Sequence, residues 1–362
     1  MRAPRGWAGL LVVTLVATAF SEAFYWYAGG TDFPVRFLFY LVPTTALLWV
    51  ASRLAVAGWQ SIVLAGAVYG FVTEGVLTPV MYGAFPFDPF ALSYTSLAWH
   101  ALVTVCFGLI GLHHLLVRAR VLTACAGVAA FGVFWGAWAV TLALPDGPTE
   151  PSEGIAAFTG EVPVDRFALY TAAVTAVVAL GHLALGRVVH AEDLVPGRRL
   201  TRVVLMLGAL YFAVAISWVV PWSLPVLLAM LWVCRAGLRR AAAVAAPAES
   251  VLVRLAERVP LTRLPVLLLL PAAAVATYAA IGGAHLSEAV TRGLFLDAVV
   301  GLQWLAGWVA LVAALVSIRR RRGVVGYSVV VPRATTTAGP VSSTRSSAVQ
   351  VTVSVPPGTS TR

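Results

Sequence analysis

The sequence contains no lysine and no asparagine, so all 25 of its basic residues are arginines. A P-loop and a pyridoxal or retinal Schiff base each need a lysine, and N-glycosylation needs an asparagine, so these three kinds of site are excluded. Both missing amino acids have A-rich codons, and Ala, Val, Gly and Arg are abundant. This composition points to a GC-rich bacterial genome.

Charged residues and cysteines are also scarce. Charged residues make up 11% of the 362 residues, hydrophobic residues make up 60%, and the mean hydropathy is +0.89. The three cysteines lie far apart in apolar segments without zinc-site spacing, so we interpret them as buried free thiols. These values are typical of an all-α, polytopic integral membrane helical bundle and leave no segment for a soluble domain.

Ten segments within residues 1–318 are apolar enough for membrane helices, each of which needs about 20 such residues. They are approximately 7–28, 34–54, 58–82, 91–117, 121–144, 167–189, 203–220, 222–238, 264–281 and 294–318. Pro221 and Pro225 leave open a re-entrant hairpin in place of two crossings at 203–238. The first segment has a signal-peptide alternative, but its length favours an uncleaved helix.

The arginines predict the orientation of these helices. With the N-terminus in the cytoplasm, only Arg36, Arg166 and Arg292 of the 25 arginines fall outside, which leaves 22 inside. This asymmetry follows the positive-inside rule, so we expect both termini to be cytoplasmic and the protein to reside in the plasma membrane. We interpret the net charge of +10 as arginines that set the orientation of the helices in the membrane. We do not interpret it as a nucleic-acid binding surface, because the arginines are dispersed between apolar spans.

Two stretches outside the spans have distinct compositions. Residues 250–260 place apolar side chains on one helical face, which predicts a short amphipathic helix on the inner membrane surface. Residues 319–362 begin with four arginines and contain no acid, which predicts a disordered cytoplasmic tail. We expect Arg319, Arg320, Arg321 and Arg322 to contact anionic lipid headgroups. The sequence identifies no protein partner.

Three ionisable residues, Glu22, Glu74 and His100, lie inside apolar spans. Each costs roughly 2.5–3.5 kcal/mol at the centre of a bilayer even on a lenient scale, so each is a candidate functional residue. At 1.5 Å of rise per residue, all three lie ~9–14 Å below the predicted outer ends of their helices. The common depth predicts that the first, third and fourth spans meet around one polar pocket open to the outer face.

Hydroxyl side chains extend this candidate site along the same helices. Residues four positions apart share a helix face, and small or hydroxylated faces let membrane helices pack closely. The expected members of the pocket, beside the three ionisable residues, are Thr18, Thr78, Ser96 and Thr104. We interpret His113, His114 and His182 as helix-end or isolated histidines with structural roles.

Several functions remain compatible with this pocket. Two carboxylates and an imidazole can share a proton, as in proton-coupled or small-solute transport. The same groups could serve an intramembrane enzyme acting on a lipid or polyprenyl substrate, or hold the helices of a non-catalytic scaffold together. They could also bind a divalent metal, but no metal-site motif is present, so we assign no metal, cofactor or catalytic residue. The second half of the chain lacks counterparts of the three ionisable residues, unlike many transporters with repeated halves.

Overall fold

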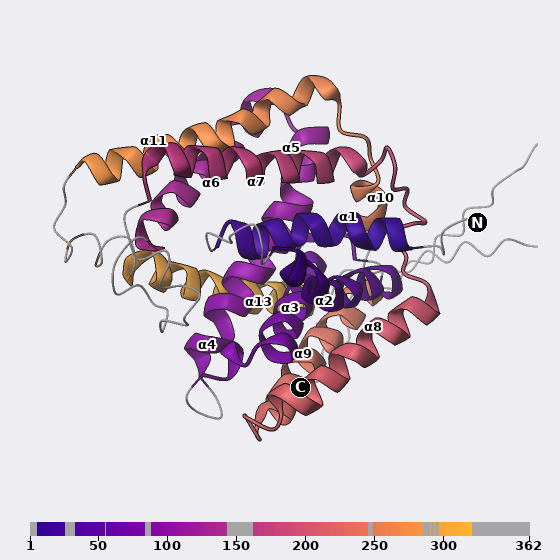
Figure 1. Ribbon diagram of the computed structural model, residues 1–362. Coiled ribbons are helices and arrows are strands. Elements are labelled where there is room, and N and C mark those ends of the chain that lie inside the picture. The colour runs from indigo at the N-terminus through magenta and orange to yellow at the C-terminus, as the bar shows by residue number, and fades with distance from the viewer. Residues whose placement is uncertain are drawn as a thin grey trace, which may run out of the picture.

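The structure is a computed structural model that describes residues 6–25, 33–54, 56–83, 88–142, 162–244, 249–284, 290, 293 and 297–320. Within these ranges the regular structure is helical, and the only β-type pairing is an isolated bridge between Leu185 and Val189. Eight of the described helices are long and apolar enough to cross a membrane. The chain is therefore an all-α bundle with membrane-spanning character (Figure 1).

Several of the helices combine an α-helical part with a π-helical or 3₁₀ part. In chain order the elements are α1 (Trp7–Thr18), η1 (Ala19–Ala23), α2 (Phe33–Arg53), α3 (Trp59–Val72), η2 (Thr73–Leu77), η3 (Val80–Tyr82), α4 (Pro89–Ser93), η4 (Tyr94–Gly111), α5 (Leu112–Val117), α6 (Val121–Leu142), α7 (Val164–Ala184), α8 (Arg198–Tyr211), η6 (Phe212–Ile216), α9 (Ser223–Val244), α10 (Val251–Leu255), η7 (Leu261–Leu268), α11 (Leu269–Gly283) and α13 (Ala298–Arg320). Of these, η1, η2, η4 and η6 are π-helical.

Each of the ten predicted spans overlaps a helix or a continuous series of joined helices. The two that fall outside the eight clearly apolar helices are the short first helix, Trp7–Ala23, and α9, which carries three arginines. The segment with the re-entrant alternative forms two long helices, Arg198–Ile216 and α9. The number of crossings and their orientation remain predictions.

The helix α3 and the continuous helix α4–η4–α5 form the centre of the bundle. In the α3–η2 helix, 89% of the residues in an 18-residue window are buried. The helix η4 contacts α1, α3 and α13. The backbones of α3 and η4 approach closely at Gly70, where a Cβ would lie 1.9 Å from the carbonyl oxygen of Ser96. Only glycine fits this position, because any side chain would push the two helices apart.

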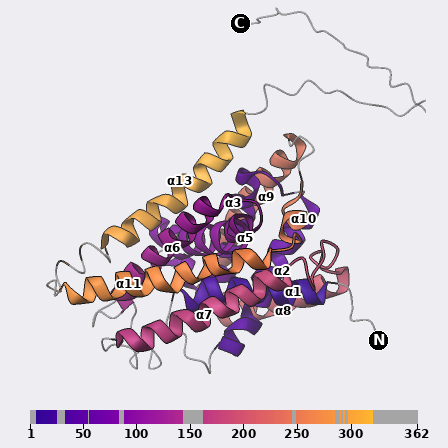
Figure 2. The same ribbon diagram turned by 90° about the horizontal axis from the view of Figure 1, so that it is seen from above.

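The remaining helices surround this centre. In Figure 1, α6, α7 and α11 lie on one side of α1–α3, and α8 and α9 lie on the opposite side. The α6–α11 contact also depends on glycine, because a Cβ at Gly136 would lie 2.2 Å from the carbonyl oxygen of Ala274. Figure 2 shows α13 running along the bundle beside α3 and α9.

The predicted amphipathic helix at 250–260 contains the five-residue helix α10. We refer to residues 249–260 as the α10 segment. Its apolar residues Leu252, Leu255 and Val259 are buried, and α10 contacts α2 and α5. The helix is thus shorter than predicted, and its apolar face is covered by protein because the adjacent helix ends offer an apolar surface. Of the predicted tail, Arg319 and Arg320 end α13 and are exposed, whereas Arg321, Arg322 and everything after them lie outside the described residues.

Candidate functional site: a buried carboxylate–imidazole network

Glu74 lies in the last turn of the α3–η2 helix, immediately before a break in that helix. Thr78 has an extended backbone (φ −133°, ψ 153°) and is followed by Pro79. Proline disfavours helical conformation in the residue before it and cannot donate a backbone hydrogen bond, so the sequence ends the helix here. One turn earlier, Gly70 brings α3 against η4, and this contact positions Glu74 beside that helix.

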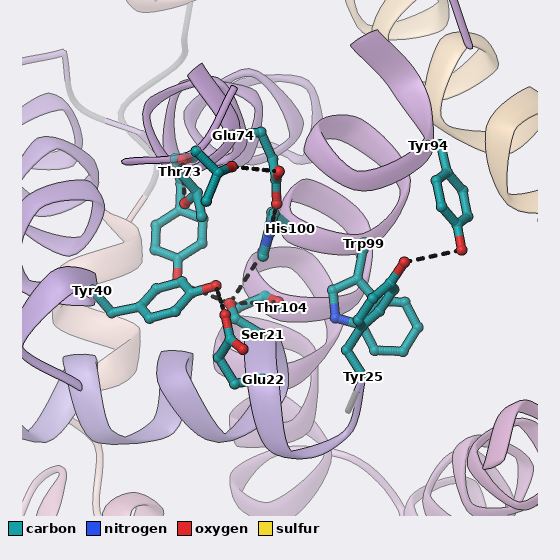
Figure 3. Close-up of polar contacts among 12 residues, drawn as sticks. Ser21, Glu22, Tyr25, Tyr40, Thr73, Glu74, Tyr94, Trp99, His100 and Thr104 are labelled. Atoms are coloured by element: carbon teal, nitrogen blue, oxygen red, sulfur yellow. Dashed lines mark hydrogen bonds and ion pairs between the residues drawn. The ribbon is translucent and has the colours of Figure 1, made fainter. Parts of the chain in front are cut away.

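His100 of η4 is the direct partner of Glu74. The distance between His100 Nε2 and Glu74 Oε1 is 2.5 Å, and the residues are only 4% and 6% exposed. Figure 3 shows the two side chains pointing toward each other from neighbouring helices. The second carboxylate oxygen of Glu74 accepts a hydrogen bond of 2.9 Å from the hydroxyl of Thr78. The carboxylate is therefore held from both sides.

Ser21 of η1 continues the network on the other side of the imidazole. Its Oγ lies 3.2 Å from His100 Nδ1, 3.0 Å from the hydroxyl of Tyr69 and 3.1 Å from the hydroxyl of Thr104. All four of these residues are buried. Hydroxyl groups both donate and accept hydrogen bonds, so the contacts from Thr78 to Thr104 form one continuous chain across three helices.

Glu22 lies beside this chain but bonds to α2. Its carboxylate forms an ion pair with Arg36 and accepts a hydrogen bond of 2.6 Å from the hydroxyl of Tyr40. The Tyr40 ring in turn lies 6.1 Å from the His100 ring, between centroids. The side chain of Arg36 is 35% exposed and that of Glu22 is 13% exposed. Glu22 thus lies at the edge of the network, between the buried pair and the surface.

Aromatic side chains close another side of the site. Tyr25 donates a hydrogen bond of 3.0 Å to Tyr94, and its ring lies 4.6 Å from the ring of Trp99. Trp99 in turn donates to the backbone oxygen of Phe20 at 3.0 Å. Figure 3 shows this aromatic group beside the His100 chain. The apolar surroundings keep water away and strengthen the electrostatic interactions inside the site.

The structure brings four of the seven expected residues into one hydrogen-bonded chain, namely Glu74, His100, Thr78 and Thr104. Glu22 neighbours this chain through Tyr40. Thr18 and Ser96 are fully buried, but their hydroxyls have no hydrogen-bond partner among the residues that the structure describes.

Sequence reasoning missed Ser21, Arg36 and Tyr40. A stripe of residues four apart on a regular α-helix predicts that Thr18 and Glu22 face the site. Ser21, three residues after Thr18, lies in the π-helical turn of η1 and contacts His100, and hydrophobic periodicity does not reveal such a turn. The signal for Arg36 was available, because it is an ionisable residue near the start of an apolar helix that follows Glu22 in the chain.

The chemical capacity of the site follows from its groups. An acid and an imidazole 2.5 Å apart can pass a proton between them without side-chain movement. Within the described parts of the chain, no group of three or more His, Cys, Asp or Glu residues is arranged to hold a metal ion.

The fold and this site define a class: a helical bundle of membrane-spanning character with a carboxylate–imidazole pair at its centre. Comparisons of the chain with models of known protein families, with curated proteins and with solved structures give no match. The function is therefore argued from the site itself.

Proposed function

We propose that the chain is a multi-pass membrane protein that couples small-solute transport to a proton carried by Glu74 and His100. The observation that carries the proposal is the 2.5 Å contact between these two buried side chains. Adding or removing one proton changes the net charge of the pair, and a net charge is costly in an apolar core. Protonation therefore favours a different helix arrangement from deprotonation, which is the requirement for coupling.

The break in the helix after Glu74 supports this proposal. Transporters commonly bind their substrates and coupling ions where membrane helices are interrupted, because unwound backbone and helix ends offer polar groups there. Here the break at Thr78 and Pro79 lies within one turn of Glu74, and the Thr78 hydroxyl bonds its carboxylate. The hydroxyls of Ser21, Tyr69 and Thr104 extend the polar path away from the break.

We further propose ten crossings in a bacterial plasma membrane, with both termini in the cytoplasm. Hydrogen bonds link four predicted inner loops at one end of the bundle: Val251 N donates to Val56 O at 2.8 Å, Arg118 Nε to Glu257 at 2.7 Å and Arg258 Nε to Gly186 O at 2.9 Å. Grouped arginine-bearing loops are what the positive-inside rule requires of one membrane face. The arginines at 319–322 then contact anionic headgroups on the same side.

Proton flux in proteoliposomes tests the proposed function. Vesicles containing the purified chain and a pH-sensitive dye are exposed to pools of small solutes under an imposed pH gradient. We expect one pool to drive proton movement and Glu74→Gln to abolish it, because the amide keeps the shape but carries no titratable proton. Glu192→Gln, the same change at an exposed residue, is the matched control. Solute-driven flux that survives in Glu74→Gln would refute the proposal.

A second candidate function follows from Ser21. A hydroxyl 3.2 Å from an imidazole that also binds a carboxylate has the order of groups found in nucleophilic hydrolases and acyltransferases. Such an enzyme would act on a lipid ester within the membrane. The geometry favours transport, because Ser21 is 2% exposed and packed between helices. Covalent labelling by a fluorophosphonate probe that Ser21→Ala abolishes would favour the enzyme.

A further inference from the structure

A second buried cluster lies further along the helix that carries His100. His113 of α5 and His182 of α7 face each other with 3.3 Å between their Nδ1 atoms, and they are 2% and 0% exposed. Their ring centroids are 5.5 Å apart. His113 is thirteen residues beyond His100 on the continuous helix η4–α5. This cluster is therefore separate from the site described above.

The outer nitrogens of both rings are fixed by backbone carbonyls. His113 Nε2 lies 3.2 Å from the carbonyl oxygen of Glu257, and His182 Nε2 lies 3.1 Å from that of Gly108. A carbonyl oxygen only accepts hydrogen bonds, so each Nε2 must carry a hydrogen. A neutral imidazole has only one N–H group, which leaves a lone pair on each Nδ1. Two lone pairs facing each other across 3.3 Å repel and satisfy neither nitrogen.

One additional proton resolves this conflict. A proton on either Nδ1 makes that ring an imidazolium, which then donates to the other Nδ1, and all four ring nitrogens are hydrogen-bonded. Burial disfavours a charge on an isolated ring, but here the charge is shared between two rings whose outer N–H groups face carbonyl oxygens. A second proton would bring two positive charges into direct contact. The geometry therefore fits one proton and excludes two.

Charged groups lie near the histidine pair, but none of them replaces the hydrogen bond between the two Nδ1 atoms. The titratable or charged residues that face it are His114 of α5, Arg118 of the following loop, and Arg254 and Glu257 of the α10 segment. The carboxylate of Glu257 is bound to Arg118, as is that of Glu249, and these hydrogen bonds raise the pKa of Arg118 above its ordinary value. The Glu257 carboxylate is thus already paired and contributes its backbone carbonyl to His113.

A small cavity gives protons a route to the pair. It has a volume of about 20 Å³ and is lined by His113, Arg118 and Glu257, among others. This volume holds one water molecule, since roughly 10–15 Å³ is sufficient. Arg118, at the rim, has a side chain that is 41% exposed. A single water molecule in this cavity would connect the His113 ring with the end of the bundle that we place in the cytoplasm.

We infer that His113 and His182 form a proton-binding site that takes up one proton, shared between the two Nδ1 atoms and loaded through this cavity. Because the outer N–H groups bind Glu257 and Gly108, the loaded site joins α5, α7, η4 and the α10 segment. The inference goes beyond the proposed transport function, and it stands even where Glu74→Gln leaves proton flux unchanged.

Nitrogen-15 NMR of the full-length protein in detergent micelles, labelled at its six histidines, tests this site. From about pH 4 to 9 we expect one proton to bind to the pair, with both Nδ1 resonances shifting together. His113→Gln or His182→Gln should abolish this shared titration, whereas His190→Gln, at an exposed histidine that does not line the cavity, should leave it unchanged.

Three results would overturn the inference: two independent titrations, no titration of either ring, or an unchanged titration of the remaining histidine after its partner is replaced. Where a variant fails to fold, the wild-type spectrum decides alone, because only a shared proton moves both Nδ1 signals in one step. Glu74→Gln serves as a further control and should leave this titration intact.

Discussion

Gly70→Ala tests whether close helix packing creates the Glu74–His100 contact. The added Cβ would lie 1.9 Å from the Ser96 carbonyl oxygen, where ordinary contact begins at 3.4 Å. The two helices must therefore separate by roughly 1.5 Å, because packed backbone cannot be compressed. One turn further along, the 2.5 Å contact would lengthen to roughly 4 Å, beyond hydrogen-bonding distance.

The energetic consequence combines three terms. Overpacking costs about 1–3 kcal/mol, and a lost hydrogen bond between charged groups costs about 1.5–3 kcal/mol, against a gain of about 1 kcal/mol from the better helix propensity of alanine. We expect the free energy of unfolding to fall by roughly 2–5 kcal/mol. The control Gly301→Ala lies in α13 with no atom within 4 Å of its Cβ, so it should not destabilise the protein.

Equilibrium unfolding in mixed detergent micelles, followed by tryptophan fluorescence, measures both variants. We expect Gly70→Ala to be destabilised and Gly301→Ala to be neutral or slightly stabilising. If Gly70→Ala unfolds within about 0.5 kcal/mol of the wild-type protein, α3 and η4 do not touch as described, and the basis of the site is wrong.

Three further predictions concern other parts of the chain. Glu74→Leu removes the hydrogen-bond partner of the buried His100 ring and of the half-buried Thr78 hydroxyl. It should destabilise the protein by about 1–3 kcal/mol for the unsatisfied imidazole, more than Glu74→Gln, in the same unfolding measurement. Equal effects of the two changes would argue against a buried hydrogen bond. Arg118→Gln removes the ion pairs with Glu249 and Glu257, so limited proteolysis should cut the α10 segment faster than in the wild-type protein. Arg120→Gln, the same change at an exposed neighbour, should not change the cleavage rate. Equal cleavage rates in the two variants would show that the ion pairs do not hold the segment. Reporter fusions after Gly154 and after Arg322 should lie outside and inside, and finding both on one side would contradict the predicted topology.

The helical architecture could be predicted well because apolar composition constrains it strongly. A long apolar segment has to satisfy its backbone hydrogen bonds internally, so it forms a helix regardless of its neighbours. All ten predicted segments overlap helices, and eight of these helices meet the length and hydropathy expected of membrane spans. The first helix and α9 show where composition is a weaker guide, because one is short and the other carries three arginines.

The site could be predicted only in part. Equal depth in a membrane restricts the partners of Glu74, and His100 lies at the same level on the next helix of the chain. Depth does not give the rotation of a helix about its axis, however. Within the π-helical turn at Ala19–Ala23, Ser21 contacts His100 and Glu22 contacts Arg36 of α2.

The pairing of His113 with His182 could not be predicted from the sequence. The two residues are 69 positions apart, and the carbonyl groups that fix their protonation belong to two further elements, η4 and the α10 segment. Neither carbonyl has a signature in the sequence, because every residue has a backbone carbonyl. Such a site depends on the tertiary arrangement of four elements.

Infrared difference spectroscopy across a pH step tests whether Glu74 and His100 hold a proton as one unit. A protonated carboxylic acid has a C=O stretching band that a carboxylate and an amide lack. We predict a band that Glu74→Gln removes, that His100→Gln shifts because the imidazole is its hydrogen-bond partner, and that Glu192→Gln leaves unchanged. A Glu74 band that is unaffected by His100→Gln, or the absence of any such band, would contradict the account.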